Sequence, residues 1–171
     1  MKSKAISAER IPAEPFPVDW EPNVIANLVF LTRGEEVLLI HKKTGFGAGK
    51  INGPGGKLEP GETAMESAVR EVQEELLITP SKLQEMGILH FDFVDGLRLH
   101  CTVFLGTEFE GVPTETREAK PEWFRIDEVP YDRMWADDRH WLPQLLAGKA
   151  FQAWFRFDEE AMLTRQVEFD E

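Results

Sequence analysis

The sequence predicts an α+β domain with the layers of an α/β/α sandwich. Apolar runs of strand length dominate the chain, one segment has strong helical periodicity, and a second helix is weaker. The length of 171 residues suits one domain, and neither an internal repeat nor a linker divides it. We therefore expect a single domain over residues 24–171, preceded by an arm over residues 1–23.

The charge balance restricts the partners that this protein can have. Lys and Arg number 19 and Asp and Glu number 31, so the net charge is −12. Such a chain is a poor partner for nucleic acid or an anionic membrane, and at first sight for any phosphate. We expect a small-molecule ligand, no nucleic-acid partner and no membrane partner, and the sequence leaves open whether the protein is a monomer or a dimer.

The only cysteine, Cys101, excludes an intramolecular disulfide framework and a cysteine-rich zinc site. It lies in an apolar run, so we interpret it as a small buried side chain. No apolar stretch approaches the ~20 residues of a membrane-spanning helix. The two lysines near the N-terminus lack the apolar segment of a secretory signal, so we expect a cytoplasmic location.

The first elements follow from proline content and apolar runs. Proline is frequent among the charged residues of 1–23, which predicts an extended arm that packs through Phe16 and Trp20. Residues 24–31 are apolar except for Asn27 and predict a buried strand. A turn at 33–35 leads to a second strand at 37–40, and a glycine-rich loop follows.

Residues 63–76 form the best-supported helix. Apolar side chains recur there at the spacing of one helical face, and Pro80 lies just beyond the end. The apolar face consists of Met65, Ala68, Val69, Val72 and Leu76.

The rest of the chain predicts mainly strands. Runs at 87–94 and 97–105 form a hairpin around residues 95 and 96. A short strand follows at 123–126, and 138–146 predicts a helix that is interrupted near Pro143. Two further strands are expected at 151–157 and 164–169.

The helix at 63–76 carries the clearest chemical signal. Glu71, Glu74 and Glu75 fall within a wedge of about 100° on the helical wheel, while Arg70 projects to a different side. Three adjacent carboxylates repel one another, and a divalent cation such as Mg²⁺ or Mn²⁺ would relieve that repulsion with oxygen ligands. The alternative is an exposed acidic helix face without a metal. The glycine-rich loop at 52–57 favours the first interpretation, because glycine permits close approach of the backbone to a ligand.

Together these residues resemble the Nudix box. Gly56 is followed after five residues by Glu62, and after seven more by Arg70, Glu71, Glu74 and Glu75 at the spacing of that signature. Leu77 stands where the box has a glycine, at the position of a left-handed helix cap. The resemblance implies the Nudix fold, an α/β/α sandwich with a central mixed β-sheet, and cleavage of a nucleoside diphosphate linked to another moiety.

The resemblance extends beyond the box. From about residue 24 onwards the chain is similar to the MutT-homologue branch, which hydrolyses oxidised purine nucleoside triphosphates. The segments 42–49 and 134–141 carry this similarity. It implies magnesium-dependent hydrolysis of substrates such as 8-oxo-dGTP and 2-hydroxy-dATP, by attack at the β-phosphorus, to a monophosphate and pyrophosphate.

The resemblance also implies roles for individual residues. Metal ligands would be the carbonyl of Gly55 together with Glu71, Glu74, Glu75 and Glu118. Catalytic roles would fall to Glu74, Glu75, Arg70 and Glu118, with Glu118 as ligand or base, and Arg70 and Glu62 would orient the carboxylates. Substrate contacts would come from Asn27, Lys42, Phe46, Asn52, Gly56, Lys57, Leu99, Trp135, Asp137 and Asp138, of which Asp137 and Asp138 read the purine edge and Trp135 stacks on it.

Other interpretations remain open from the sequence. Trp135 is equally compatible with a core position, Asp137 and Asp138 with a helix N-cap, and Lys42 with a solvated surface. A Nudix enzyme of this kind could instead act on a nucleotide sugar, ADP-ribose or a capped 5′ end. A nucleotide-binding module without catalysis is the third possibility, although the complete set of box carboxylates argues against it.

Overall fold

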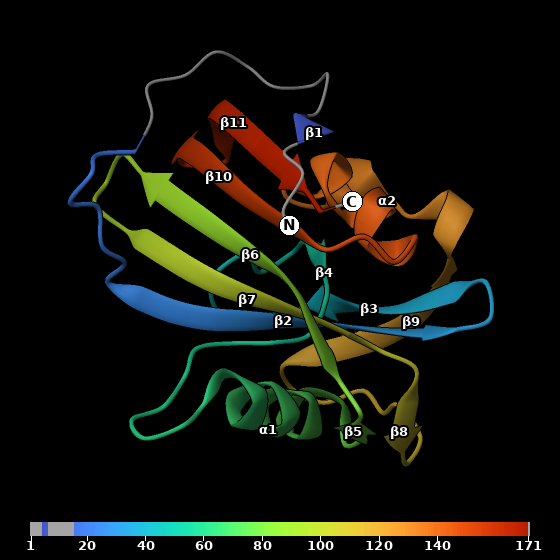
Figure 1. Ribbon diagram of the computed structural model, residues 1–171. Helices are drawn as coiled ribbons and strands as arrows, with labels where there is room; N and C mark the ends of the chain where they lie inside the picture. Colours follow the sequence, from blue (N-terminus) through green and yellow to red (C-terminus); the bar gives the residue numbers. More distant parts are fainter. Residues whose placement is uncertain (1–4, 7–15, 171) are drawn as a thin grey trace.

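The computed structural model describes residues 5–6 and 16–170, and over these residues the chain forms one mixed nine-stranded sheet with two α-helices (Figure 1). The strand order is β1-β11-β10-β6-β7-β2-β3-β4, and β9 pairs with the free side of β3. The pairs β2–β7 and β6–β10 are parallel and the others are antiparallel. The strands are β1 (Ala5–Ile6), β2 (Val24–Arg33), β3 (Glu36–Lys42), β4 (Ile51–Asn52), β6 (Gln84–Phe93), β7 (Arg98–Gly106), β9 (Ala119–Arg125), β10 (Phe151–Asp158) and β11 (Ala161–Phe169).

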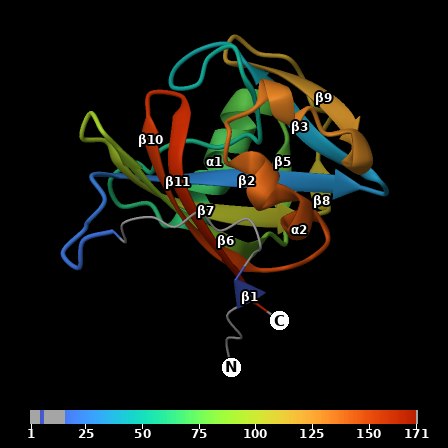
Figure 2. The same cartoon turned by 90° about the horizontal axis from the view of Figure 1, so that it is seen from above.

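The two helices cover opposite faces of the sheet. Figure 1 shows α1 (Ala64–Leu76) below the sheet and α2 (Leu142–Leu146) above it, and α2 lies over β2 when the molecule is seen from above (Figure 2). Each helix has its own apolar core, because strand side chains alternate between the faces. On β2, Val29 and Leu31 pack in the α1 core, whereas Phe30 packs in the α2 core. The predicted α/β/α sandwich with a mixed sheet is confirmed.

The helix α1 begins and ends close to its predicted bounds. Thr63 and Glu66 form a capping box, in which the Thr63 hydroxyl accepts from the Glu66 N–H and the Glu66 carboxylate accepts from the Thr63 N–H. The predicted face buries Ala68, Val72 and Leu76 completely. Met65 is an exception, because it is 39% exposed.

The helix predicted at 138–146 is two pieces. A 3₁₀ turn at Asp138–His140 ends before Trp141, and α2 then begins at Leu142 with Pro143 in its first turn. Proline is tolerated there because the N–H groups of a first turn have no helical acceptor. The interruption therefore lies at Trp141, two residues before its predicted place at Pro143. Pro143 belongs to the first turn of α2 and does not break the helix.

The short strands β1, β5 (Thr79–Ser81) and β8 (Glu108–Glu110) escaped prediction, and β1 lies within the predicted arm, where it pairs with β11. β5 and β8 form a separate two-stranded sheet beyond the end of α1. Strands of three residues are too short for a visible alternation pattern. The remaining predicted strands are present, with ends that differ from the expected ones by up to four residues, and Ile126 belongs to a 3₁₀ turn after β9.

The described part of the arm packs as predicted. The Phe16 and Trp20 rings lie 5.0 Å apart, and the Trp20 indole N–H donates to Asp92 Oδ1 at 3.1 Å on β6. The prolines at 12 and 15 lie outside the described residues. None of the helices in the described ranges is long and apolar enough to cross a membrane.

Candidate active site

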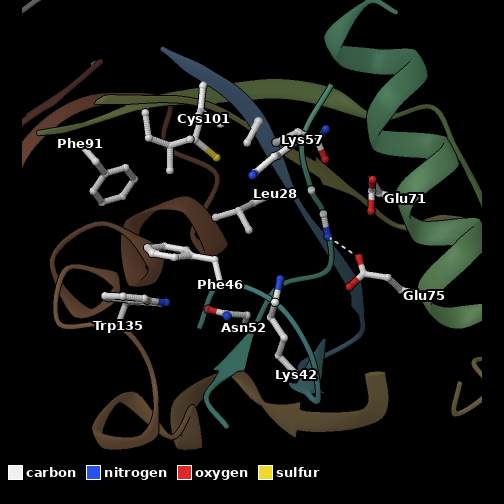
Figure 3. Close-up of a pocket in the computed structure, with 18 of the residues that line it drawn as sticks. Leu28, Lys42, Phe46, Asn52, Lys57, Glu71, Glu75, Phe91, Cys101 and Trp135 are labelled. Atoms are coloured by element: carbon white, nitrogen blue, oxygen red, sulfur yellow. Dashed lines mark hydrogen bonds between the residues drawn. The ribbon is translucent and has the colours of Figure 1, made fainter. Parts of the chain in front are cut away.

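A cavity of about 510 Å³ lies between β2, the glycine-rich loop, α1 and the segment before α2 (Figure 3). Figure 3 shows Phe46 and Trp135 on one side of it, Glu71 and Glu75 on the other, and Lys42 between them. Most of the predicted site residues line this one cavity: Asn27, Lys42, Phe46, Asn52, Gly55, Gly56, Lys57, Glu71, Glu75, Leu99, Glu118, Trp135, Asp137 and Asp138. Arg70 and Glu74 are not among the lining residues.

The carboxylate end of the cavity is partly desolvated. Glu75 is only 3% exposed, and its Oε1 accepts a hydrogen bond from the Gly55 N–H at 2.8 Å. Burial, reinforced by the negative charges of Glu71 and Glu118, raises the pKa of Glu75 to about 7. Burial also raises the pKa of Glu71. Nearby positive charge would therefore stabilise the ionised form of both carboxylates.

Two glycines allow the loop to approach these carboxylates. A Cβ atom on Gly56 would lie 2.5 Å from the Glu71 carboxylate, and one on Gly55 would lie 2.1 Å from the backbone oxygen of Asn27. Gly55 also has a φ of +152°, which favours glycine. Any side chain at either position would push the loop away from its neighbours on β2 and α1.

Arg70 contradicts the prediction that it projects away from the acidic cluster. Its Nη1 donates to Glu71 Oε1 at 2.9 Å and to Glu74 Oε2 at 3.2 Å, while Nε and Nη2 hold Glu62 through two hydrogen bonds. The long Arg70 side chain bends along the helix surface. A helical wheel shows only the direction in which a side chain leaves the helix, so it does not represent this bend. Arg70 thus relieves part of the repulsion that the sequence assigned to a cation.

The carboxylate oxygens at this end of the cavity suit a hard cation, although they are not arranged around a common point. Over the described ranges, no three Asp, Glu, His or Cys side chains are grouped in a way that could hold a metal ion. Arg70 and the Gly55 N–H engage Glu71 and Glu75 instead. The chemistry nevertheless fits, because Glu71, Glu75 and Glu118 offer carboxylate oxygens in one cavity and two of them are buried at an electrostatic cost. The Glu74 side chain is half exposed and outside this set.

The opposite end of the cavity is aromatic. Phe46 stacks on Trp135 with ring centroids 5.0 Å apart and an interplanar angle of 17°, and Phe93 lies edge-on to both rings. Trp135 also packs against the α2 core, so the same ring belongs to the core and to the wall of the cavity. Phe46 is 52% exposed and forms the outer lip of the cavity. Flat apolar surfaces of this kind suit a planar ring.

A buried acidic pair lies beside the aromatic residues. Asp137 and Asp138 are 2% and 6% exposed, and Asp137 Oδ2 accepts from the Trp141 indole N–H at 2.9 Å. Asp137 Oδ1 has no partner among the described residues. Burial raises the pKa of both carboxyl groups, and the charge of Asp137 raises that of Asp138 further, which favours a retained proton on Asp138. The N-cap interpretation fails, because Asp137 makes no side-chain capping hydrogen bond.

Asn27 and Lys42 meet the cavity in different ways. The Asn27 side chain donates from Nδ2 to Ser67 Oγ on α1 at 2.8 Å and is 1% exposed. Lys42 lies inside the cavity, where its charge lowers the pKa of Glu75 and so opposes the effect of burial. Lys42 is therefore partly buried at the cavity, whereas Lys43 pairs with Glu115 at the surface.

Sequence reasoning missed several apolar lining residues. Phe91 and Phe93 on β6 and Leu97 before β7 all face the cavity. The alternation along β6 marked Phe91 and Phe93 as inward-facing, but it could not separate a core wall from a cavity wall. Cys101 is buried as expected and also contributes to the wall.

Comparison with known proteins agrees with this arrangement. The sequence model of the NUDIX domain matches residues 22–145. The chain is 42% identical over 134 residues to an "Oxidized purine nucleoside triphosphate hydrolase" of Danio rerio, and 40% identical to the protein of the same name from Mus musculus; each match covers 78% of this chain and 86% of the relative. Among solved structures, a mutator MutT protein from Bacillus halodurans superimposes with a TM-score of 0.74 at 27% identity, over 84% of this chain and 97% of that protein.

Proposed function

The chain belongs to the NUDIX family, and we propose that it hydrolyses oxidised purine nucleoside triphosphates to the monophosphate and pyrophosphate. One observation supports this most strongly: a single cavity has a stacking surface and a buried acidic pair at one end and a set of carboxylates at the other. The names of the Danio rerio and Mus musculus relatives point to the same substrate class. Substrates of the 8-oxo-dGTP and 2-hydroxy-dATP type would place the base at the first end and the phosphates at the second.

The aromatic end of the cavity would bind the purine and hydrogen-bond to the donors and acceptors on its edge. Trp135 would stack on the base, and Asn52 would offer an amide to its edge. A protonated Asp138 donates one hydrogen bond, whereas an ionised Asp137 only accepts, so the pair presents both functions side by side. Oxidation of guanine at C8 converts N7 from an acceptor to a donor, and a site with both functions can bind the altered edge.

The phosphate end would use Mg²⁺, with Mn²⁺ as a substitute. Glu71, Glu74, Glu75, Glu118 and the Gly55 carbonyl are the proposed ligands, and the cation would supply charge neutralisation and activation of a water molecule. Arg70 orients Glu71 through a direct hydrogen bond, Glu62 holds Arg70 in place, and Lys42 would bind phosphate oxygens. Glu118 stands apart from the helix and would accept the proton of the attacking water.

The net charge of −12 does not oppose this function. Part of the negative charge faces the cavity at Glu71, Glu75 and Glu118, where a cation would offset it. Lys42 and Lys57 place positive charge beside the same site. We also propose that residues 24–171 act as one domain with 1–23 as an arm, that the partner is a nucleotide and not a nucleic acid or membrane, and that the protein works in the cytoplasm.

A substrate panel tests this proposal. The full chain is assayed with 8-oxo-dGTP, 2-hydroxy-dATP, dGTP, a nucleotide sugar, ADP-ribose and a capped RNA 5′ end, each with and without Mg²⁺. We expect magnesium-dependent release of pyrophosphate and monophosphate, with the highest kcat/KM for the oxidised triphosphates. A preference for the sugar, ADP-ribose or the cap would identify a different Nudix substrate, and no turnover of any compound would indicate a binding module.

A further inference from the structure

The last turn of α1 is capped by a distant loop. Glu75 and Leu76 belong to that turn, whose carbonyl groups lack helical partners, and its side chains include no basic residue. The Thr114 N–H donates to the Leu76 carbonyl at 2.9 Å, and the Thr116 hydroxyl donates to the Glu75 carbonyl at 2.7 Å. The loop before β9 therefore provides partners for two carbonyl groups at the end of α1, in addition to the backbone cap at Leu77.

The hydroxyl of Thr116 connects two cavity carboxylates. While it donates to the backbone oxygen of Glu75, it accepts a hydrogen bond from the backbone N–H of Glu118 at 3.3 Å. The hydroxyl oxygen of Thr116 thus connects the backbone of Glu75, on α1, to the backbone of Glu118, in the loop. Both of these side chains line the same cavity, and the negative charge of Glu118 raises the pKa of Glu75.

The loop is also held from the other side. The Lys43 N–H donates to the Glu118 carbonyl at 2.9 Å, and Lys43 Nζ donates to the Thr116 carbonyl at the same distance. The Thr116 N–H closes a turn on the Ala119 carbonyl at 2.9 Å. These bonds fix the loop to the end of β3. Among the hydrogen bonds of the described residues, only those of the Thr116 hydroxyl connect Glu118 to α1.

From this geometry we infer that Thr116 is a positioning residue, whose hydroxyl sets the placement of Glu118 relative to Glu75 and so the affinity of the carboxylate end for a divalent cation. The inference rests on the proposed function, because it assumes that these carboxylates bind a cation. Groups that orient metal ligands typically change affinity by about 10–100-fold when removed. Thr116 touches neither the reacting atoms nor the base.

The test compares matched variants of the full chain by direct Mn²⁺ binding, measured from the electron paramagnetic resonance signal of free Mn²⁺. Thr116→Val keeps the shape and removes the hydroxyl, and Thr116→Ser keeps the hydroxyl. Thr114→Val is the control, because its exposed hydroxyl only donates to the Val112 carbonyl at 2.7 Å in the same loop. Melting temperature in EDTA reports stability without metal.

We expect Thr116→Val to bind Mn²⁺ at least about tenfold more weakly, while Thr116→Ser and Thr114→Val bind like the wild type. The Mg²⁺ concentration for half-maximal turnover should rise by the same factor, with KM for nucleotide little changed. If Thr116→Val does not fold, Thr116→Ala removes the same hydroxyl without placing a methyl group there.

Equal Mn²⁺ affinity of wild type and Thr116→Val overturns the inference, and so does equal weakening in Thr116→Ser. Either failure leaves a wild type that binds Mn²⁺ and hydrolyses nucleotides. A wild type that binds no Mn²⁺ and shows no turnover instead overturns the proposed function, and the inference with it.

Discussion

Leu77 ends α1 in the left-handed conformation, with φ 59° and ψ 31°, at the position where the Nudix box has a glycine. Its N–H donates to the Gln73 carbonyl at 2.9 Å, so the cap forms without glycine. The side chain is 60% exposed. The substitutions Leu77→Gly and Leu77→Ala both remove the side chain beyond Cβ, and their difference isolates the backbone strain.

Two opposing effects set the size of this difference. A residue with a Cβ costs about 1–2 kcal/mol in the left-handed region. Glycine costs about 0.4–1 kcal/mol relative to alanine, because its unfolded chain has more freedom to lose. At the midpoints of these ranges the relief of strain outweighs the loss of freedom, so we expect Leu77→Gly to be more stable than Leu77→Ala by about 0.8 kcal/mol, or roughly 2–3 °C in Tm.

Urea denaturation of the two variants measures this difference, with Gln73 as the matched control. Gln73 is exposed inside the same helix. There the order should reverse, with Gln73→Ala more stable than Gln73→Gly by about 0.5–1 kcal/mol. If Leu77→Ala were as stable as Leu77→Gly, or more stable, the left-handed cap would not describe the end of α1.

Three further predictions concern the cavity. In metal-free buffer Glu75 should contribute about 3 kcal/mol to a fall in the free energy of unfolding as pH rises from near 4.5 to 7, because the folded state raises the pKa of Glu75 and disfavours its ionised form. Glu75→Gln should remove this share of the slope in urea titrations at several pH values, while Glu71, Asp137 and Asp138 keep theirs, and should lower turnover by orders of magnitude; an unchanged slope would refute the assignment to Glu75. Arg70→Lys should lower kcat at least about tenfold, because one ammonium group cannot hold Glu62 and Glu71 together, and wild-type turnover would show that this clamp is unimportant. Asp138→Ala should lower kcat/KM for 8-oxo-dGTP by at least about tenfold through one lost hydrogen bond, and steady-state kinetics with unchanged kcat/KM would exclude Asp138 from base recognition.

The helix and the glycine-rich loop were predictable because their signals are local. Apolar spacing and the residues around Thr63 define α1, and the spacing of Glu71 and Glu75 needs only the helical repeat. Arg70 was misplaced because a long flexible side chain can reach partners away from its Cβ direction. Met65 was misplaced because periodicity identifies a face but does not show which positions of that face the core covers.

The properties that give the site its chemistry depend on contacts that are distant in sequence. The raised pKa of Glu75 comes from its burial together with the charges of Glu71 and Glu118, and the retained proton on Asp138 comes from the enclosed position of the pair. The loop that carries Thr116 meets α1 only in the folded chain. No periodicity or spacing in the sequence contains these contacts, although resemblance to known Nudix proteins identified most of the residues involved.

The most direct test of the proposed function is a competition assay in which the full chain, with Mg²⁺, receives 8-oxo-dGTP and dGTP in the same tube. The consumption of each nucleotide over time gives the ratio of their kcat/KM values, independent of enzyme concentration. The buried acidic pair and the stacking surface predict faster consumption of 8-oxo-dGTP, with pyrophosphate and the monophosphate as products. Equal consumption of both nucleotides, or preference for dGTP, would contradict recognition of the oxidised base in this cavity.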